Sequence, residues 1–307
     1  MKMNTDGILL IDKPQGYTSF DVVARMRGML STRKVGHAGT LDPMATGVLP
    51  VFVGRATKCC DILPRQDKRY LAEFVLGKTT DTQDITGTVL TESAVDVNEK
   101  DVEKVLESFR GKIQQIPPMY SAVQVDGKRL YELARKGVEV ERKPRDIEIF
   151  SLELIESDAE NARYVIDVHC SKGTYIRTVC HDIGQELGCG ATLTGLRRTM
   201  AAGFGIGECI TIDEANELAE KNCLREKLIP ISEAFRSLAE INLSEDQTRM
   251  FRNGVRLDAK RCRVQKNSQE NRYRVLGADR TFLGIAHIGE DGHTLYCDKL
   301  FATEGNP

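Results

Sequence analysis

The segment KVGHAGTLDPMATGVLPVFVGRATK, residues 34–58, decides how this chain is interpreted. It is dense in Gly, Thr and Pro and lacks a helical period, so we predict a long functional loop over residues 31–58. Asp42 precedes a proline, which favours an extended backbone, and the nearby glycines allow a ligand to approach closely. Beside His37 and several cations, Asp42 is a candidate nucleophile, general base or metal ligand. The alternative is an aspartate that closes an Asx turn, a common use of Asp in loops.

Hydrophobic periodicity on either side of this segment predicts a mixture of strands and helices. Residues 8–11 suit a short buried strand, and Ser19 is placed to cap the helix that follows. Residues 70–76 alternate between apolar and polar side chains, which is typical of a strand with one buried face. Further predicted elements are a helix capped by Asn98 and ended by Gly111, a hairpin or arm over 126–145, strands over 147–155 and 163–170, helices over 176–187 and 212–222, and short strands over 273–276, 282–287 and 294–297.

Composition indicates an ordinary globular protein. The chain has 307 residues, of which 41% are hydrophobic and 29% charged, and no apolar stretch approaches the ~20 residues of a membrane span. The apolar run at 8–11 is too short for a signal-peptide core. Nine cysteines include no C-x-x-C pair; Cys180, His181 and Cys189 come nearest to a ligand cluster, and reduced thiols on a helix and its trailing loop are the simpler interpretation. We expect a cytoplasmic protein without disulfides or a metal.

Charge is unevenly distributed along the chain. The net charge of -2 on its own favours a small-molecule enzyme over a nucleic-acid binder. However, residues 25–69 hold nine basic against three acidic residues, and residues 241–280 hold ten against five. Residues 81–109 and 205–226 are acidic instead. Because the local field depends on local charge, we expect the basic stretches to line one surface suited to RNA and the acidic helices to face away.

Four motifs, in order along most of the chain, resemble the TruB family of tRNA pseudouridine-55 synthases. They are GILLIDKPQGYTSFDVVARMR from residue 7, the 34–58 segment, KRYLAEFVLGKTTDTQDITG from residue 68, and GTYIRTVCHDIGQELGCGATLTGLRRT from residue 173. The resemblance implies an α+β pseudouridine synthase fold, with a mixed, mostly antiparallel sheet, flanking helices and a small C-terminal PUA-like β-barrel. It also implies a catalytic domain over 1–240, with an RNA-gripping insertion at about 124–146, and an RNA-binding domain over 241–307.

The activity implied is isomerisation of uridine to pseudouridine at position 55 in the T-loop of tRNA, by base flipping and without a cofactor or metal. The partner would be the T-arm of tRNA, and the enzyme would be a cytoplasmic monomer that needs no protein partner. Two other hypotheses share these motifs: a guide-RNA-dependent pseudouridine synthase, which usually has terminal extensions, and a catalytically silent tRNA-binding or tRNA-folding module. A metabolite enzyme is suggested only by the net charge.

The resemblance also assigns roles to residues at the reaction centre. Asp42 matches the catalytic aspartate, and three routes stay open for it: attack at C1′ of the sugar, attack at C6 of the base, or help in removing the 2′ proton. Arg177 would pair with Asp42 and keep its carboxylate ionised and in position. Tyr70 would stack on the target base. Asp84 would join the polar network around Arg177.

Five further positions match the family's motifs. Tyr175 and Leu196 match residues that touch the target nucleotide. His37 matches the residue that fills the space left by the extruded base, where a neutral imidazole can both stack and form hydrogen bonds. Lys13 and Thr18 would support the active-site loop structurally.

Overall fold

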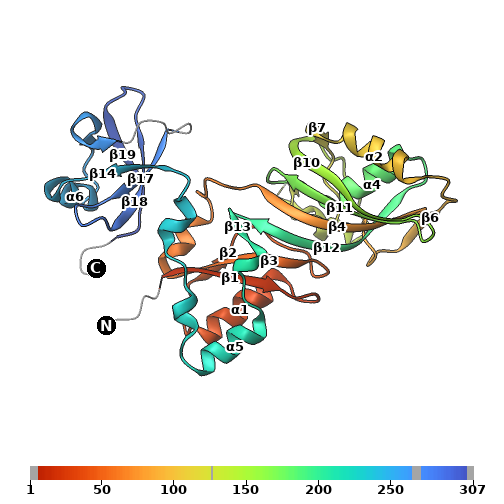
Figure 1. Cartoon of the computed structure of the whole chain (residues 1–307), viewed down its shortest axis with the longest axis horizontal. Coiled ribbons are helices and arrows are strands. Elements are labelled where there is room, and N and C mark those ends of the chain that lie inside the picture. The colour runs from red at the N-terminus through yellow and green to blue at the C-terminus, as the bar shows by residue number, and fades with distance from the viewer. Residues whose placement is uncertain (1–5, 126, 265–270, 303–307) are drawn as a thin grey trace.

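A computed structural model describes residues 6–125, 127–264 and 271–302, and a long twisted sheet dominates it (Figure 1). Within these residues the sheet has the order β1-β3-β12-β4-β11-β10-β7, with β2 paired to β3 and β13 paired to β12. Its neighbours pair antiparallel except for β3 and β12, so the mixed, mostly antiparallel sheet is confirmed. The strands are β1 (Gly7–Lys13), β2 (Val35–His37), β3 (Thr46–Val53), β4 (Lys68–Leu76), β7 (Gly111–Gln115), β10 (Arg145–Asp158), β11 (Arg163–Cys170), β12 (Ala191–Ala201) and β13 (Phe204–Gly205).

Helices pack at both ends of this sheet (Figure 1). At one end α1 (Ser19–Met29) and α5 (Ile212–Glu220) enclose an apolar core with β1 and β3. At the other end α2 (Glu99–Ser108) and α4 (Ile176–Glu186) cover a larger core that includes Tyr70. No helix among the described residues is long and apolar enough to cross a membrane. The flanking helices implied by the resemblance are therefore present.

The prediction of a long loop over residues 31–58 is wrong. This stretch contains β2, β3 and the 3-10 helix η1 (Gly54–Cys59). β3 is buried along Gly47–Val53, so both of its faces are covered and its side chains do not alternate between apolar and polar. A glycine and Pro50 within it further disguise the strand. The irregular part shrinks to residues 31–34 and to residues 38–45, which carry Asp42.

The cap of α1 also differs by one residue from the prediction. Thr18, not Ser19, is the N-cap: its Oγ1 accepts a hydrogen bond from the Asp21 amide at 3.1 Å, and the Asp21 carboxylate accepts one from the Thr18 amide at 2.8 Å. Either hydroxyl can cap a helix, so sequence alone does not choose between them. Ser19 is left free to bind the loop that carries Asp42.

Two small hairpins extend from the sheet. β5 (Lys78–Thr80) pairs with β6 (Val89–Glu92). β8 (Gln124–Val125) pairs with β9 (Lys128–Arg129), and the short helix α3 (Leu130–Ala134) follows. The second hairpin falls in the segment predicted to be an arm, of which Asp126 lies outside the described residues.

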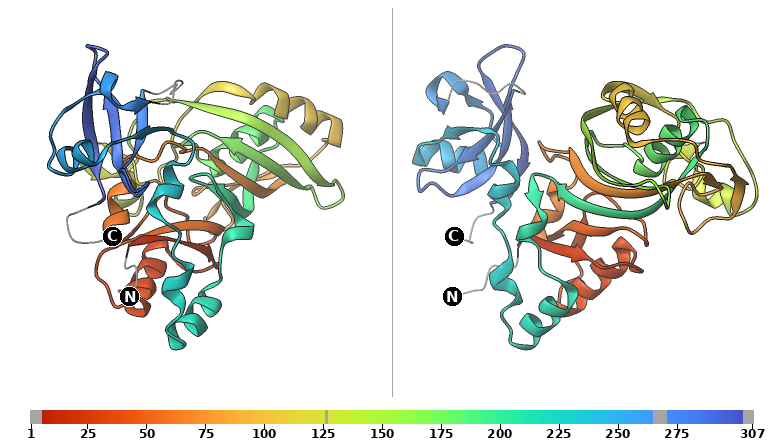
Figure 2. Two further views of the ribbon diagram at one scale, coloured as in Figure 1. Left: turned by 60° about the vertical axis from the view of Figure 1, so that its left-hand side comes forward. Right: turned by 45° about the vertical axis from the view of Figure 1, so that its right-hand side comes forward.

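A second, curled sheet follows the long one, and Figure 2 shows it as a separate body at one end of the molecule. In the described part of the chain its order is β15-β19-β18-β17-β14-β16, consistent with the PUA-like unit. The 3-10 helices η2 (Ile206–Glu208), η3 (Leu224–Lys227) and η4 (Ile231–Phe235) lie between the two sheets in sequence. The elements of the second body are β14 (Ala239–Asn242), α6 (Glu245–Arg252), β15 (Leu257–Asp258), η5 (Ala259–Arg261), β16 (Arg263–Val264), β17 (Arg272–Leu276), β18 (Phe282–Ile288) and β19 (Thr294–Leu300).

Polar and apolar contacts join the two bodies. The Arg55 guanidinium donates to the Phe301 carbonyl at 2.8 Å, and the Arg272 guanidinium donates to the Ile62 carbonyl at 3.0 Å. The rings of Phe235 and Phe301 meet with their centroids 5.9 Å apart, in a core that both bodies share. Burial of these rings provides a strong apolar contribution to the junction.

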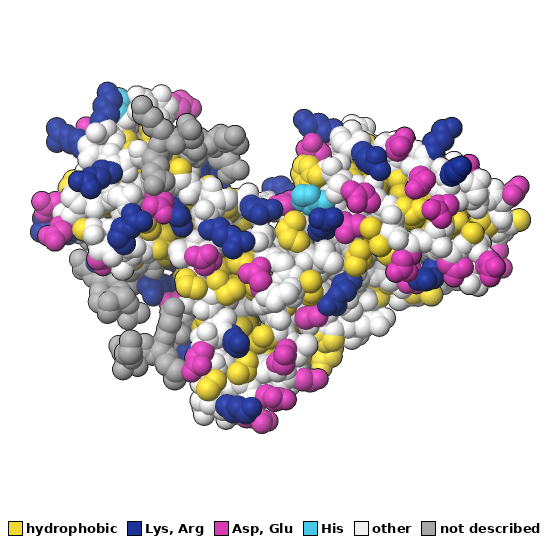
Figure 3. Space-filling view, viewed as in Figure 1, with side chains coloured by type: hydrophobic (Ala, Val, Ile, Leu, Met, Phe, Trp, Pro, Cys, Tyr) yellow, Lys and Arg dark blue, Asp and Glu magenta, His cyan; other side chains and the backbone are white. Residues whose placement is uncertain are grey.

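Several cations of the basic stretches bind other groups of the fold, which their count in the sequence does not predict. Arg55 and Arg272 form the junction just described, and Lys58 donates to the Leu300 carbonyl at 3.2 Å. Arg69 pairs with Asp167 at 2.6 Å on the sheet. Figure 3 shows acidic and basic side chains interspersed on the face in view. A basic run in the sequence therefore includes cations that serve the fold.

The approach of β3 to β12 generates a prediction about stability. Gly47 has a φ of +103°, and a Cβ there would lie 2.2 Å from the carbonyl oxygen of Arg198. Gly47→Ala should therefore lower the free energy of unfolding by about 2–4 kcal/mol, as measured by denaturant titration. The control is Gly28→Ala within α1, where a Cβ meets nothing within 4 Å and helix propensity should raise stability slightly. Equal stabilities for the two variants would contradict this interpretation.

Candidate active site

An ion pair between Asp42 and Arg177 lies at the centre of the candidate site. Arg177 Nε is 3.1 Å from Asp42 Oδ2, so the expected pair is present. The Arg177 side chain, in the first turn of α4, is only 7% exposed, whereas the Asp42 side chain is 41% exposed. A buried cation thus holds a carboxylate whose other side faces solvent. This arrangement leaves the carboxylate accessible to a ligand.

The remaining guanidinium nitrogens of Arg177 bind the chain at other places. Nη1 donates to the Thr82 carbonyl at 3.0 Å and to Asp84 Oδ2 at 3.4 Å. Nη2 donates to the Tyr120 carbonyl at 2.9 Å. A planar guanidinium with partners on each nitrogen has little rotational freedom, so the direction in which Nε meets Asp42 is set by the fold.

Asp84 is held as firmly as Arg177. Its Oδ1 accepts hydrogen bonds from Thr82 Oγ1 at 2.8 Å, the Thr86 amide at 3.0 Å and Thr86 Oγ1 at 2.5 Å. Its side chain is 6% exposed. Asp84 therefore compensates the buried charge of Arg177 and reaches Asp42 only through that arginine, as its predicted place in the network requires.

Three contacts fix the backbone on both sides of Asp42. Before it, Ser19 Oγ accepts from the Leu41 amide at 2.9 Å and donates to the Leu41 carbonyl at 3.3 Å. After it, the Pro43 carbonyl accepts from the Gly16 amide at 2.8 Å. The turn itself is closed by the Asp42 carbonyl, which accepts from the amide three residues later at 3.0 Å. The Asp42 carboxylate pairs with Arg177, which disfavours the Asx-turn alternative.

Lys13 and Thr18 lie behind this loop. The Lys13 ammonium is fully buried and donates to the carbonyls of Pro14 at 2.9 Å, Tyr17 at 2.6 Å and, at 3.4 Å, Pro43. Burial lowers the pKa of Lys13 to about 8, although the negative charge of Asp42 opposes the shift. Thr18 caps α1, as described above, and acts on the loop only through that helix.

Tyr70 and Leu196 share a core with Leu41 and Met44 of the loop, and Tyr175 begins the helix that carries Arg177. Tyr70 on β4 is 6% exposed, and burial raises the pKa of its phenol to about 12, so the ring stays neutral. Leu196 on β12 lies opposite Ala72 and packs against the same core as Tyr70. Tyr175 is the N-cap of α4, and its backbone exchanges two hydrogen bonds with the buried Gln115 side chain, at 2.9 and 3.1 Å.

His37 ends β2, at the start of the loop that carries Asp42. Its ring meets the Phe20 ring edge to face, with centroids 5.7 Å apart and an interplanar angle of 89°. Its Nδ1 is buried without a hydrogen-bond partner in the structure. Burial lowers the pKa of His37, and the charge of Arg198 lowers it further, so the imidazole is neutral at pH 7.

Sequence reasoning missed Arg198, the largest fully buried side chain in the described part of the chain. Its guanidinium donates to the Val48 carbonyl at 2.7 Å and the Gly39 carbonyl at 2.9 Å, which joins β3 to the loop before Asp42. Arg197 beside it points the other way and pairs with Asp12 at 2.7 Å. Strand alternation was the available signal: of two adjacent arginines on a strand, one faces inward.

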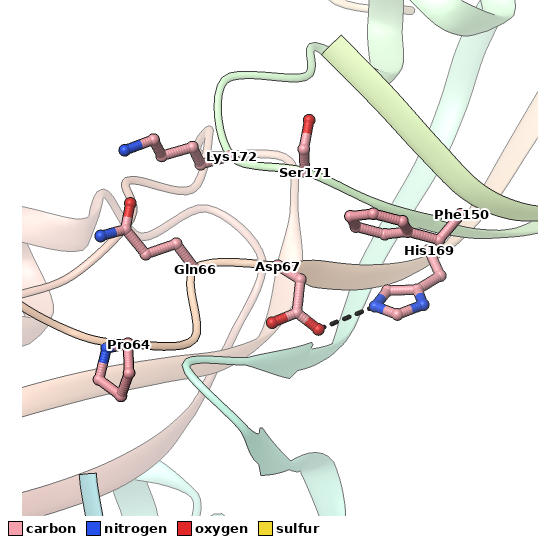
Figure 4. Close-up of a pocket in the computed structure, with 7 residues that line it drawn as sticks. All are labelled: Pro64, Gln66, Asp67, Phe150, His169, Ser171 and Lys172. Atoms are coloured by element: carbon pink, nitrogen blue, oxygen red, sulfur yellow. Dashed lines mark hydrogen bonds and ion pairs between the residues drawn. The ribbon is translucent and has the colours of Figure 1, made fainter. Parts of the chain in front are cut away.

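Two cavities lie among other residues. One, of about 390 Å³, is lined by Pro64, Gln66, Asp67, Phe150, His169, Ser171 and Lys172 (Figure 4). In it His169 Nε2 lies 2.8 Å from Asp67 Oδ2. The other, of about 570 Å³, shares Ser171 and Lys172 with it. The predicted site residues line neither of these two cavities.

The cysteines form no metal centre in the structure. All nine are free thiols, and Cys180 is buried on α4. Among the described residues, no group of three or more His, Cys, Asp or Glu side chains is arranged to hold a metal ion.

Known proteins match the chain along most of its length. The model of the TruB family pseudouridylate synthase N-terminal domain matches residues 27–176, that of the tRNA pseudouridylate synthase B C-terminal domain matches 177–236, and that of the pseudouridine synthase II TruB C-terminal region matches 239–296. The tRNA pseudouridine synthase B of Clostridium kluyveri is 44% identical over 280 residues, which cover 91% of this chain and 94% of that protein. The chain belongs to the TruB family. It is therefore a pseudouridine synthase, an isomerase.

A further TruB relative and two solved structures are also similar to this chain. The tRNA pseudouridine synthase B of Syntrophotalea carbinolica is 49% identical over 251 residues, or 81% of each chain. A structure described as a Cbf5-Nop10-Gar1 complex matches with a TM-score of 0.76 and 24% identity, covering 97% of this chain and 86% of that one. A second, described as an H/ACA RNP bound to a substrate RNA containing 2′-deoxyuridine, matches with a TM-score of 0.75, 22% identity and the same coverage. These two likenesses show the fold.

The buried Lys13 yields a prediction about pH. Its pKa is about 8 in the folded protein and about 10.4 in an unfolded chain, so between these values only the unfolded chain keeps the proton. The free energy of unfolding should therefore rise with pH across this window, by up to about 3 kcal/mol from Lys13. Lys13→Met should lose this rise, and denaturant titrations of both proteins at pH 7.5 and pH 10 measure the difference. Parallel pH profiles would show that Lys13 does not titrate in this window.

Proposed function

We propose that this protein converts uridine to pseudouridine at position 55 in the T-loop of tRNA, with Asp42 as the catalytic carboxylate. The observation that carries the proposal is the solvent-facing Asp42 carboxylate on the buried Arg177 guanidinium, 3.1 Å away. The relatives named tRNA pseudouridine synthase B, at 44% and 49% identity, support tRNA as the substrate.

The proposed reaction requires a carboxylate that is fixed in position. The N1–C1′ bond of uridine breaks, the base turns, C5 bonds to C1′, and the proton on C5 is released while N1 gains one. The product is an isomer of the substrate, so no redox or group-transfer partner is needed. Asp42 can act at C1′, at C6 or on the 2′ proton, and in each case its direction relative to the sugar decides the rate. Arg177 fixes that direction because its own position is set by Thr82, Asp84 and Tyr120.

The target uridine must leave the stacked T-loop to reach Asp42. Extrusion of a base costs a few kcal/mol of lost stacking and pairing. The partly exposed Tyr175 and Leu196, and the buried Tyr70 beside them in the proposed pocket, are assigned to contact the extruded base. His37, neutral because burial lowers its pKa, is suited to fill the space left behind.

Two further segments are proposed to bind the T-arm. The predicted insertion at 124–146 carries exposed cations, among them Arg129 and Arg135, whose guanidinium groups lie 5.9 and 5.6 Å from the Tyr131 ring. We assign residues 1–240 to the catalytic domain and 241–307 to an RNA-binding domain, where exposed Lys260 and Arg263 are available to phosphates.

The protein is proposed to act as a monomer in the cytoplasm, without cofactor, guide RNA or protein partner. Two solved structures of similar fold are complexes with other proteins, so the guide-dependent alternative is tested directly. Purified protein alone, mixed with a tRNA transcript labelled with tritium at C5 of uridine, distinguishes the two. Release of tritium supports stand-alone action, and the modified position is read by sequencing.

Asp42→Asn should abolish tritium release while leaving tRNA binding within about twofold, because the amide keeps the shape of the side chain but loses its charge and basicity. Filter binding and the release assay measure the two properties. The matched control is Asp167→Asn, which removes another carboxylate paired with an arginine, Arg69 at 2.6 Å. Retained turnover in Asp42→Asn, or an equal loss in Asp167→Asn, would remove Asp42 from the catalytic role.

Replacing Lys260 and Arg263 by Gln should weaken tRNA binding and reduce the slope of log Kd against log salt by about one to two, since fewer counterions are displaced. The control pair is Lys100 and Lys104 on the acidic helix α2, where both residues are also exposed. Salt titrations of binding compare the two double variants. Identical slopes in all three proteins would exclude Lys260 and Arg263 from the tRNA contact.

A further inference from the structure

Phe20 is the most exposed large apolar side chain among the described residues. It is 69% exposed, although it lies at the second position of α1, a helix that buries Val22, Val23 and Met26. Single exposed apolar residues are common on protein surfaces. Phe20 differs because its ring has a defined partner, the His37 ring, at 5.7 Å and 89°. It is an open aromatic surface with a fixed orientation.

The backbone of Phe20 is tied to the loop that carries Asp42. Thr18 forms the capping box with Asp21, the residue after Phe20, and so fixes the start of α1. Ser19, the residue before Phe20, forms two hydrogen bonds with Leu41, the residue before Asp42. These contacts set the position of the Phe20 backbone relative to the loop that carries Asp42.

The chain between Phe20 and His37 carries more basic than acidic residues. It contains Arg25, Arg27, Arg33 and Lys34, all exposed, against the single acidic residue Asp21. Cations and an exposed aromatic ring on one segment are the combination that binds unpaired RNA, in which cations meet phosphates and rings stack on bases.

We propose that Phe20 is a positioning residue that stacks on an unpaired base next to the extruded uridine, while its edge-to-face contact holds the His37 ring in the opened loop. This inference rests on the proposed base-flipping function. The ligand is a nucleobase of the RNA substrate, and sequence tolerance is expected because every base has a stacking face. Phe20 acts on the chemistry only through the geometry of the flipped loop.

The test compares Phe20→Ala, Phe20→Leu and Phe20→Tyr. If the ring stacks on a base, Phe20→Ala should lower kcat/KM for tritium release on the order of tenfold. Phe20→Leu should be nearly as impaired as Phe20→Ala, and Phe20→Tyr should have nearly the kcat/KM of the unsubstituted protein. A tRNA transcript with 2-aminopurine next to the target uridine provides the second readout. Its fluorescence change on binding, measured in an Asp42→Asn background to prevent turnover, should shrink with Ala and Leu and return with Tyr.

Phe150→Ala is the matched control. Like Phe20, Phe150 is an exposed phenylalanine against a histidine ring: it is 48% exposed, its ring lies 4.9 Å from that of His169 at 52°, and it lines the cavity of Figure 4. It should leave both readouts unchanged, and thermal unfolding of all variants should match the unsubstituted protein. If the unsubstituted protein releases no tritium, the proposed function fails. If the unsubstituted protein does release tritium, three results would each overturn the stacking role of Phe20. They are a kcat/KM of Phe20→Ala equal to that of the unsubstituted protein, a kcat/KM of Phe20→Leu equal to that of Phe20→Tyr, and a loss of kcat/KM in Phe150→Ala as large as in Phe20→Ala.

Discussion

The buried guanidinium of Arg177 is the constraint on which the site depends. Removing a cation from water is costly unless its donors are all satisfied, so the fold must bring acceptors to it from several directions. The acceptors are the carbonyls of Thr82 and Tyr120 and the carboxylates of Asp84 and Asp42. Segments far apart in sequence thus converge on one side chain, and the position of the Asp42 carboxylate follows from that convergence.

Sequence reasoning succeeded where one residue pattern corresponds to one structure. The alternation along β4 and the Asn98 cap of α2 were predicted correctly, because a half-covered strand and an N-cap each leave a local signature. The motifs also identified Asp42 and Arg177, which the structure brings together. β3 escaped prediction because a strand that is covered on both faces has no alternation to detect.

Arg198 and the basic stretches were misjudged for a related reason. An arginine in a sequence is normally a surface residue, and only the direction of its Cβ on a strand tells whether it faces solvent or core. Arg198 points inward to the Val48 and Gly39 carbonyls, and Arg55 points to the Phe301 carbonyl across the junction. Counting cations therefore overestimates the number of basic side chains that are free to contact RNA, because backbone carbonyls occupy some of their donors.

Solvent exposure differs between the side chains that hold Asp42 in position and the Asp42 carboxylate itself. Arg177, Arg198, Asp84 and Lys13 are nearly or fully buried, and in a low-dielectric interior their electrostatic contacts are strong and rigid. The Asp42 side chain is 41% exposed, as the proposed attack by its carboxylate requires. A site that reorganises little on binding uses less of the binding energy to order its own groups, and more remains for the proposed extrusion of the base. The rigidity around Asp42 and the openness above it are therefore two requirements of the same reaction.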